Sequence, residues 1–174
     1  MAKAIILSAG QGRRLFPMTA ERPKCLLPIQ GKALIEWQLD ALEACGVRQV
    51  TVVTGFGAAQ VEDLLSRRDG TASTTTCFNP FFEVADNLIS CWVARDAMDE
   101  DFILLNGDTL FEPAVLERVM ASPSQPVTLA TDQKASYDAD DMKISLSGQR
   151  LRRVGKDLPS GQTDGESIGL MMFR

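Results

Sequence analysis

The sequence contains no histidine, and this absence excludes several kinds of chemistry. Without an imidazole there is no Ser-His-Asp or Cys-His catalytic group and no histidine-based zinc or haem site. The four cysteines form no CxxC pair, which excludes a zinc ribbon and a thioredoxin-type motif. Cysteines in this pattern, without a signal peptide, are typical of reduced thiols in a cytoplasmic protein. No apolar run reaches the roughly 18 residues of a membrane-spanning helix, so we expect no membrane partner.

The composition is that of an ordinary globular protein, with 45% hydrophobic and 24% charged residues in a chain of 174. This length predicts a single domain over residues 1–174. The net charge of −5 argues against a nucleic-acid partner. Residues 1–30 nevertheless carry five basic side chains and one acidic side chain, a balance that suits a small polyanion. Residues 96–141 carry eleven acidic and two basic side chains, which indicates either a solvated face or a divalent-metal site.

Hydrophobic patterning predicts strands that alternate with helices. The expected strands are 3–8, 47–54, 74–78, 102–105, 127–131 and 168–173, with a hairpin over 142–147 and 150–155. The expected helices are 33–45, 58–68, 87–98 and 112–121. This order predicts an α/β fold: a Rossmann-like, three-layer, mostly parallel sheet with an antiparallel hairpin addition. Ligands of such sheets bind at the carboxyl ends of the strands.

A glycine-containing loop follows the first predicted strand. Gly10 and Gly12 allow the backbone to approach a phosphate closely and direct N–H groups toward it. Arg14 and Lys24 add positive charge against a triphosphate. The loop is not the P-loop motif, because the string GxxxxGK[ST] is absent, and it is not the dinucleotide fingerprint, because Leu15 stands where a third glycine is needed.

The string AGQGRRLFPMTAERPKCLLPI resembles the signature of the nucleotidyltransferases that make activated sugars and alcohols, approximately GxGxRxxPxTxxxPKxLLP. The resemblance implies the fold of the nucleotide-diphospho-sugar transferases. It also implies that Arg14 and Lys24 are catalytic. The residues that it assigns to nucleotide binding here are Leu7, Ala9, Gly10, Gln11 and Gly12.

A second motif, Asn106-Gly107-Asp108, follows the strand predicted at 102–105. Alone it is typical of a turn, but a carboxylate at the end of a buried strand also suits Mg²⁺. The resemblance assigns the metal-binding aspartate to Asp108 and a nucleotide contact to Gly107. Members of the family usually have a second metal-binding aspartate further along the chain, so we expect a domain truncated after Arg174, with its completeness as a catalyst left open.

The stretch Asp86-Asn87-x-x-Ser90 resembles the Asn-Asn-x-x-Ser pattern of cytidylyltransferases that activate phosphocholine, inositol phosphate or aminoethylphosphonate. On this resemblance Asn87 and Ser90 bind the nucleotide, although Asp86 or Asn87 can equally cap a helix. Lys156 and Glu166 are the acceptor-binding candidates, each of which has an alternative as a surface charge. Lys143 is a second candidate for the lysine near the acceptor, but its favoured interpretation is a solvated charge at a strand edge.

The resemblance implies a Mg²⁺-dependent enzyme that joins a nucleoside triphosphate, with CTP favoured, to a phosphorylated or phosphonylated small alcohol or amine and releases pyrophosphate. Two alternatives stay open: a sugar-1-phosphate uridylyl- or thymidylyltransferase, and a nucleotide-binding module without turnover. The expected partners are the nucleotide and the small acceptor. A homodimer is compatible with the sequence.

Overall fold

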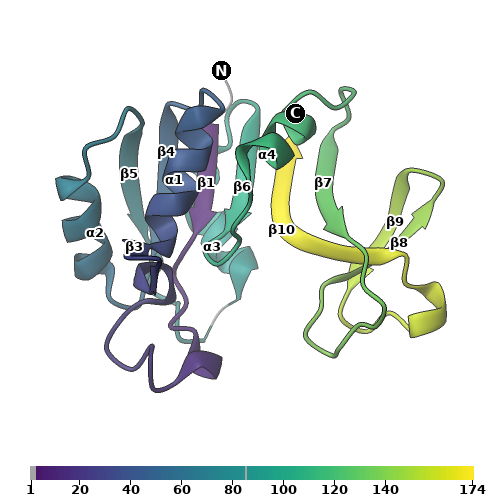
Figure 1. Cartoon of the computed structure of the whole chain (residues 1–174), viewed down its shortest axis with the longest axis horizontal. Coiled ribbons are helices and arrows are strands. Elements are labelled where there is room, and N and C mark those ends of the chain that lie inside the picture. Colours follow the sequence, from purple (N-terminus) through teal and green to yellow (C-terminus); the bar gives the residue numbers. More distant parts are fainter. Residues whose placement is uncertain (1–2, 85) are drawn as a thin grey trace.

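An eight-stranded mixed sheet forms the frame of the molecule (Figure 1), which a computed structural model describes over residues 3–84 and 86–174. The strand order is β5-β4-β1-β6-β10-β8-β9, and β7 pairs with β10. The strands β1, β4, β5 and β6 are parallel, whereas β10 is antiparallel to β6, β7 and β8. The strands of this sheet are β1 (Lys3–Leu7), β4 (Gln49–Thr54), β5 (Ser73–Phe78), β6 (Phe102–Asn106), β7 (Val127–Asp132), β8 (Lys143–Ser147), β9 (Arg150–Gly155) and β10 (Gly165–Phe173).

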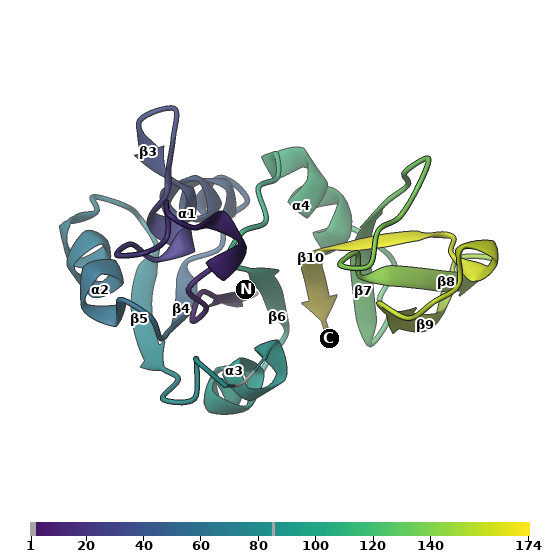
Figure 2. The ribbon, with the colours of Figure 1, turned by 90° about the horizontal axis from the view of Figure 1, so that it is seen from below.

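Helices cover both faces of the sheet. They are α1 (Leu34–Ala44), α2 (Ala58–Arg67), α3 (Asn87–Val93) and α4 (Pro113–Met120). Figure 2 shows α1 and α4 on one side of the sheet and α3 on the other. Short 3₁₀ turns lie at Arg13–Leu15, Lys24–Leu26, Arg95–Ala97 and Ser160–Gln162. The α/β architecture with a mostly parallel sheet and an added β8–β9 hairpin confirms the fold predicted from the sequence.

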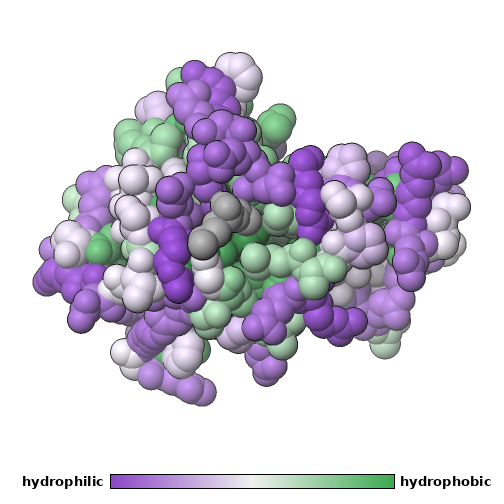
Figure 3. Space-filling view, turned by 90° about the horizontal axis from the view of Figure 1, so that it is seen from above, coloured by the Kyte–Doolittle hydropathy of each residue, from purple (hydrophilic) through white to green (hydrophobic). Residues whose placement is uncertain are grey.

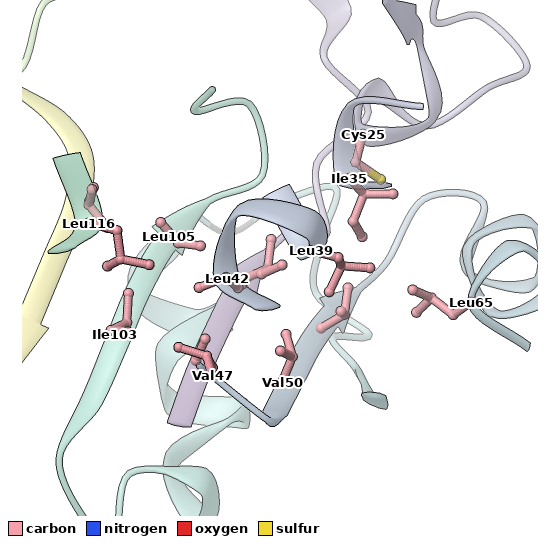
Figure 4. Close-up of a cluster of buried hydrophobic side chains, with 14 of the residues drawn as sticks. Cys25, Ile35, Leu39, Leu42, Val47, Val50, Leu65, Ile103, Leu105 and Leu116 are labelled. Atoms are coloured by element: carbon pink, nitrogen blue, oxygen red, sulfur yellow. The ribbon is translucent and has the colours of Figure 1, made fainter. Parts of the chain in front are cut away.

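The main core lies between the sheet and the α1 face. Ile35, Leu39 and Leu42 repeat at helical spacing and are fully buried. They pack with strand residues that include Val50 and Leu105 (Figure 4). A second cluster on the α3 face contains Ile5, Leu7 and Phe102.

The strand β1 is buried on both faces. Its neighbours Ile5 and Ile6 are both 0% exposed, yet they belong to different clusters. Successive side chains of a strand point to opposite faces, so each of the two isoleucines is covered by a different helical layer. This double burial explains why the strand appears in the sequence as an unbroken apolar run.

Two local elements differ from the sequence prediction. The helix expected over 87–98 ends at Val93, and a 3₁₀ turn over Arg95–Ala97 follows. The tighter turn keeps Ala94 and Ala97, three residues apart, against the second cluster. A small separate hairpin, β2 (Pro28–Ile29) with β3 (Lys32–Ala33), was not predicted, because its strands have two residues each.

The last strand begins earlier than expected, at Gly165 rather than at residue 168, and it bends sharply (Figure 1). The residues before the bend pair with β8 and with the end of β7, whereas the residues after it pair with β6 and the rest of β7. Gly169 stands at the bend with φ +78°, and the register of the pairing with β7 shifts between Ser167 and Met171. The left-handed φ suits glycine at this position.

The two ends of the parallel strands lie on opposite faces of the molecule. Figure 3 shows the face at which β1 begins, where hydrophilic residues occupy both sides and hydrophobic residues gather in the centre. The loops that follow β1 and β7 lie at the opposite end of the strands, at the bottom of Figure 1.

Among the helices over 3–84 and 86–174, none is long and apolar enough to cross a membrane.

Candidate active site

A cleft opens where β1 and β6 end. Its volume is about 450 Å³, within the range of roughly 300–1,000 Å³ that is usual for ligand pockets. It lies at the carboxyl ends of parallel strands, the usual ligand edge of such sheets. The residues that line it are Leu7, Ser8, Gly10, Gly12, Arg14, Lys24, Cys25, Asn87, Asn106, Gly107, Asp108, Asp140, Asp141, Met142, Lys156, Glu166, Ser167 and Ile168.

The loop after β1 is held in shape by its own side chains. The hydroxyl of the buried Thr19 donates a 2.9 Å hydrogen bond to the carbonyl oxygen of Gly12. The side-chain amide of Gln11 donates to the carbonyl oxygens of Thr19 and Ala20 at 3.5 Å each. A Cβ atom at Gly12 would lie 3.0 Å from Cβ of Lys24. The absence of a side chain at Gly12 therefore gives Lys24 room to reach the cleft.

Lys24 forms an ion pair with Asp108. The lysine begins the 3₁₀ turn Lys24–Leu26, and the aspartate follows β6. Their side chains are 27% and 42% exposed, so solvent and ligands reach both groups. The pair places an ammonium group and a carboxylate side by side, where a phosphate can take the first and a cation the second.

Asp140 joins two cationic side chains from different parts of the chain. One of its carboxylate oxygens lies 2.7 Å from a guanidinium nitrogen of Arg14, and the other lies 3.3 Å from Nζ of Lys156. The hydrogen bond from Lys156 and the charge of Arg14 hold the pKa of Asp140 below its usual value. The three residues thus connect the loop after β1 to the segment after β9.

Glu166 lies at the same side of the cleft as part of a second ionic group. Its carboxylate lies 2.6 Å from Nζ of Lys134, which also lies 3.0 Å from a carboxylate oxygen of Asp141. The side chains of Glu166 and Asp141 are only 12% and 13% exposed. The two carboxylates raise the pKa of Lys134, chiefly through the hydrogen bond to Glu166.

The start of α3 combines capping with a position in the cleft. The carboxylate of Asp86 accepts a 3.0 Å hydrogen bond from the backbone N–H of Leu88 and so caps the helix. The amide of Asn87 lines the cleft and donates a 3.2 Å hydrogen bond to Oδ1 of Asn106. Ser90 is 3% exposed, and its hydroxyl accepts a 3.0 Å hydrogen bond from Asn79.

The structure brings most of the predicted site residues together. Those that line the cleft are Leu7, Gly10, Gly12, Arg14, Lys24, Asn87, Gly107, Asp108, Lys156 and Glu166. Ala9, Gln11 and Ser90 lie outside this lining. Ala9 is buried, and its carbonyl oxygen accepts a 2.9 Å hydrogen bond from the N–H of Phe56. The roles that the sequence assigned to these residues stay predictions.

Several lining residues were not predicted. Cys25 lies within the first motif and Ser8 directly precedes it, so both were within reach of sequence reasoning. Burial raises the pKa of the Cys25 thiol to about 11, so this thiol is neutral at pH 7. Asp140 and Asp141 are two of many acids between residues 96 and 141, and no local signal separates them from the others.

The interpretation of Lys143 as a solvated edge charge was wrong. The residue is 7% exposed, and its ammonium group donates a 2.7 Å hydrogen bond to the carbonyl oxygen of Lys156. β8 is not an edge strand, because Lys143 pairs with Glu166 of β10 on one side and with Gly155 of β9 on the other. Lys143 therefore supports the backbone of a cleft residue.

The described residues contain no group of three His, Cys, Asp or Glu side chains that could hold a metal ion. Asp108 offers one carboxylate at the cleft. One carboxylate, with substrate phosphates and water as the other ligands, suffices for Mg²⁺ in many sites. The residues present therefore fit a metal that arrives with a phosphorylated ligand.

Comparisons with known proteins show the family to which this chain belongs. A family model described as "MobA-like NTP transferase domain" matches residues 4–153. The CMP-5'-(3-aminopropyl)phosphonate synthase of Streptomyces rubellomurinus is 36% identical over 90% of this chain, which spans 26% of that protein. The CTP:phosphoglutamine cytidylyltransferase of Campylobacter jejuni is 30% identical over 98% of this chain and 72% of that protein. The chain thus spans about a quarter of the first relative and most of the second.

Among solved structures, the inositol-1-phosphate CTP transferase of T. maritima superposes with a TM-score of 0.85. The match covers 99% of this chain and 70% of that one, at 22% sequence identity. At this identity the likeness establishes the fold.

Proposed function

Because this chain belongs to the family of MobA-like NTP transferase domains, we propose that it transfers a nucleotidyl group from CTP to a phosphorylated or phosphonylated small molecule and releases pyrophosphate. One observation carries the proposal: Arg14, Lys24 and Asp108 line a single cleft at the carboxyl ends of β1 and β6. Two cations suit a triphosphate, and the carboxylate beside them suits the divalent cation that accompanies it.

In the proposed reaction an oxygen of the acceptor's phosphate or phosphonate attacks the α-phosphorus of the nucleotide. The new P–O bond forms as the bond between the α-phosphorus and the bridging oxygen breaks, and pyrophosphate leaves with that electron pair. The attacking oxygen is already anionic near pH 7, so the reaction needs no general base. Catalysis then consists of positioning and charge neutralisation, which is consistent with a site that contains no histidine.

Each cation of the cleft has a place in this scheme. The ammonium group of Lys24 neutralises the charge that develops at the α-phosphate, and the guanidinium of Arg14 holds the leaving pyrophosphate. Backbone N–H groups of the loop at Gly10 and Gly12 face the phosphates. Lys156 and Glu166 bind the acceptor from the other side of the cleft.

Asp108 is the residue that we assign to hold Mg²⁺. A Mg²⁺ ion held by this carboxylate would supply positive charge against the phosphates of the nucleotide. Asp108 is paired with Lys24 in the free protein, so a phosphate must take over the ammonium group as the carboxylate turns to the cation. The proposal thus couples metal binding to nucleotide binding.

The choice of CTP has two supports. Both of the curated relatives described above carry CMP or CTP in their names. In addition, Asn87, from the stretch that resembles the cytidylyltransferase pattern, lines the cleft with its side-chain amide hydrogen-bonded to Asn106.

The test incubates the protein with MgCl₂, one of CTP, UTP, dTTP, ATP or GTP, and one of phosphocholine, inositol 1-phosphate, 2-aminoethylphosphonate or glucose 1-phosphate. Pyrophosphate release is followed, and mass spectrometry identifies the product. We expect a CMP-linked product with CTP, and loss of the product on addition of EDTA. Product formation with UTP or dTTP and a sugar 1-phosphate would overturn the choice of CTP. Binding of CTP without product in any mixture would favour a nucleotide-binding module without turnover.

A further inference from the structure

A buried glutamine connects the core to the cleft. Gln38 lies on α1, in the helix that also carries Ile35, Leu39 and Leu42, and it is 1% exposed. A glutamine surrounded by apolar side chains needs hydrogen-bond partners to offset its loss of hydration. Its partners lie in the turn that carries Asp108.

The side-chain nitrogen of Gln38 donates two hydrogen bonds to this turn. One goes to the carbonyl oxygen of Asn106 and the other to the carbonyl oxygen of Thr109, both at 2.8 Å. The two acceptors flank Asp108 in the sequence. The amide therefore fixes the backbone on both sides of the residue whose carboxylate faces Lys24.

The opposite side of the turn is attached to neighbouring strands. The hydroxyl of Thr109 donates a 2.7 Å hydrogen bond to the carbonyl oxygen of Ile168 on β10. The backbone N–H of Gly107 donates a 2.8 Å hydrogen bond to the carbonyl oxygen of Leu7 on β1. The turn is thus held between a helix and two strands.

The arrangement carries an energetic cost at Gln38. Its side-chain oxygen is buried and accepts no hydrogen bond within the part of the chain that the structure describes. An unpartnered buried acceptor destabilises the folded state, and an apolar side chain of similar volume would avoid this penalty. Core packing alone therefore does not explain a glutamine here, whereas the need for two donors beside the turn does.

We propose that Gln38 is a positioning residue, which acts on the reaction by holding the turn from Asn106 to Thr109 so that the Asp108 carboxylate faces the cleft. This inference rests on the proposed function for its effect on catalysis. Its structural part, that Gln38 holds the turn, stands independently. A positioning partner of this kind typically changes metal affinity or activity by about 10- to 100-fold when it is removed.

The main variant is Gln38→Met, which keeps the length of the side chain and removes both donors. A second variant, Thr109→Val, removes the hydroxyl that holds the turn from the side of β10. The matched control is Leu42→Ala, which creates a cavity on the same helix and lowers the unfolding temperature without removing a contact to the turn. All measurements are made well below the unfolding temperature of the least stable variant.

The first readout is hydrogen exchange of the free protein, without metal or nucleotide. The N–H groups of Gly107 and Thr109 are hydrogen-bonded to Leu7 and Asn106, so their exchange reports on the turn. We expect these two N–H groups to exchange about tenfold faster in Gln38→Met and Thr109→Val than in the unaltered protein. In Leu42→Ala we expect their exchange rate, relative to that of other core amides, to be the same as in the unaltered protein.

The second readout is the concentration of Mg²⁺ at half-maximal rate, with CTP saturating. We expect it to rise about tenfold or more in Gln38→Met and Thr109→Val and to stay unchanged in Leu42→Ala. Unaltered exchange together with an unaltered Mg²⁺ requirement in Gln38→Met would overturn the inference. If the unaltered protein forms no product, the proposed function fails, and the exchange comparison alone decides whether Gln38 holds the turn.

Discussion

Lys24 and Asp108 form an ion pair across the cleft although 84 positions separate them in the sequence. The pair connects the loop after β1 to the turn after β6. Both side chains are partly exposed, and such pairs stabilise a protein by only about 0–1 kcal/mol. The ion pair can therefore separate at little cost in stability, which frees Lys24 to bind a phosphate and Asp108 to bind a cation.

Replacement of the lysine tests its assigned role. Lys24→Ala should lower kcat about 10²-fold, because a transition-state charge loses its partner, and should change the unfolding free energy by less than about 1 kcal/mol. Lys32→Ala is the control, since Lys32 is paired with Asp40, outside the cleft lining. Steady-state kinetics and urea unfolding measure the two effects. Equal turnover in Lys24→Ala and Lys32→Ala would contradict the role of Lys24.

Asp140 competes with an anionic ligand for Arg14 and Lys156. In Asp140→Asn both cations lose a charged partner, so CTP should bind about two- to fivefold more tightly, the range expected for exposed ion pairs. Titration calorimetry at low ionic strength measures this change, and added salt should reduce it. Asp99→Asn is the control, because Asp99 pairs with Lys3 at the start of β1, at the other edge of the sheet. Weaker CTP binding by Asp140→Asn would count against this competition.

The bend of β10 depends on the absence of a side chain at Gly169. A Cβ atom there would collide with the amide of Asn106, and the φ of +78° adds strain. Gly169→Ala should destabilise the protein by more than about 2 kcal/mol. Gly148→Ala is the matched control, because Gly148 has a φ of +61° but open space around its Cβ position. Gly148→Ala should lower the free energy of unfolding by about 1 kcal/mol. Equal unfolding free energies for the two variants would exclude the collision as a cause.

Glu43 should make stability depend on pH. Its carboxylate on α1 accepts a 2.6 Å hydrogen bond from Arg68 and a 3.0 Å hydrogen bond from the N–H of Ala72. The Arg68 guanidinium is the main cause that lowers the pKa of Glu43 to about 2. Because the folded pKa lies below the unfolded value, this stabilisation is complete above about pH 5 and is lost as pH falls toward 2.

Urea unfolding at pH 7 and pH 3 measures this dependence. From pH 7 to pH 3 the unfolding free energy of the unaltered protein should fall by about 1–2 kcal/mol more than that of Glu43→Gln. Glu62→Gln, which replaces an exposed carboxyl group on α2, should show the same loss as the unaltered protein. A Glu43→Gln variant with an unchanged pH dependence would contradict the assignment to Glu43.

The sequence predicted the strands and helices because their signals are local. Ile5 and Ile6 belong to a short apolar run, and Leu39 and Leu42 repeat at helical spacing. The first motif also predicted Arg14 and Lys24 as neighbours of a phosphate, because order and spacing within one loop are visible in a linear sequence. Their actual roles stay predictions until the variants are measured.

The partners of these residues could not be predicted. Asp140 lies 126 positions from Arg14, and the contact between them depends on how β10 and the β8–β9 hairpin join the sheet. The error at Lys143 has the same origin, because the strands that pair with β8 and the carbonyl oxygen of Lys156 that accepts its hydrogen bond come from other parts of the chain. Gln38 has no motif around it, and its importance depends on a turn 68 positions away.

The bend at Gly169 has a consequence for the motion of the molecule. Residues 165–167 belong to the side of the cleft that carries Glu166, and residues 170–173 pair with β6, whose end carries Asp108. One continuous strand, β10, therefore joins the side of the cleft that carries Glu166 to the side that carries Asp108. A hinge motion that moved these two sides apart would break strand pairing. We expect substrates to enter and products to leave through movements of the loops over 8–24 and 133–142, while the distance between the walls stays nearly constant.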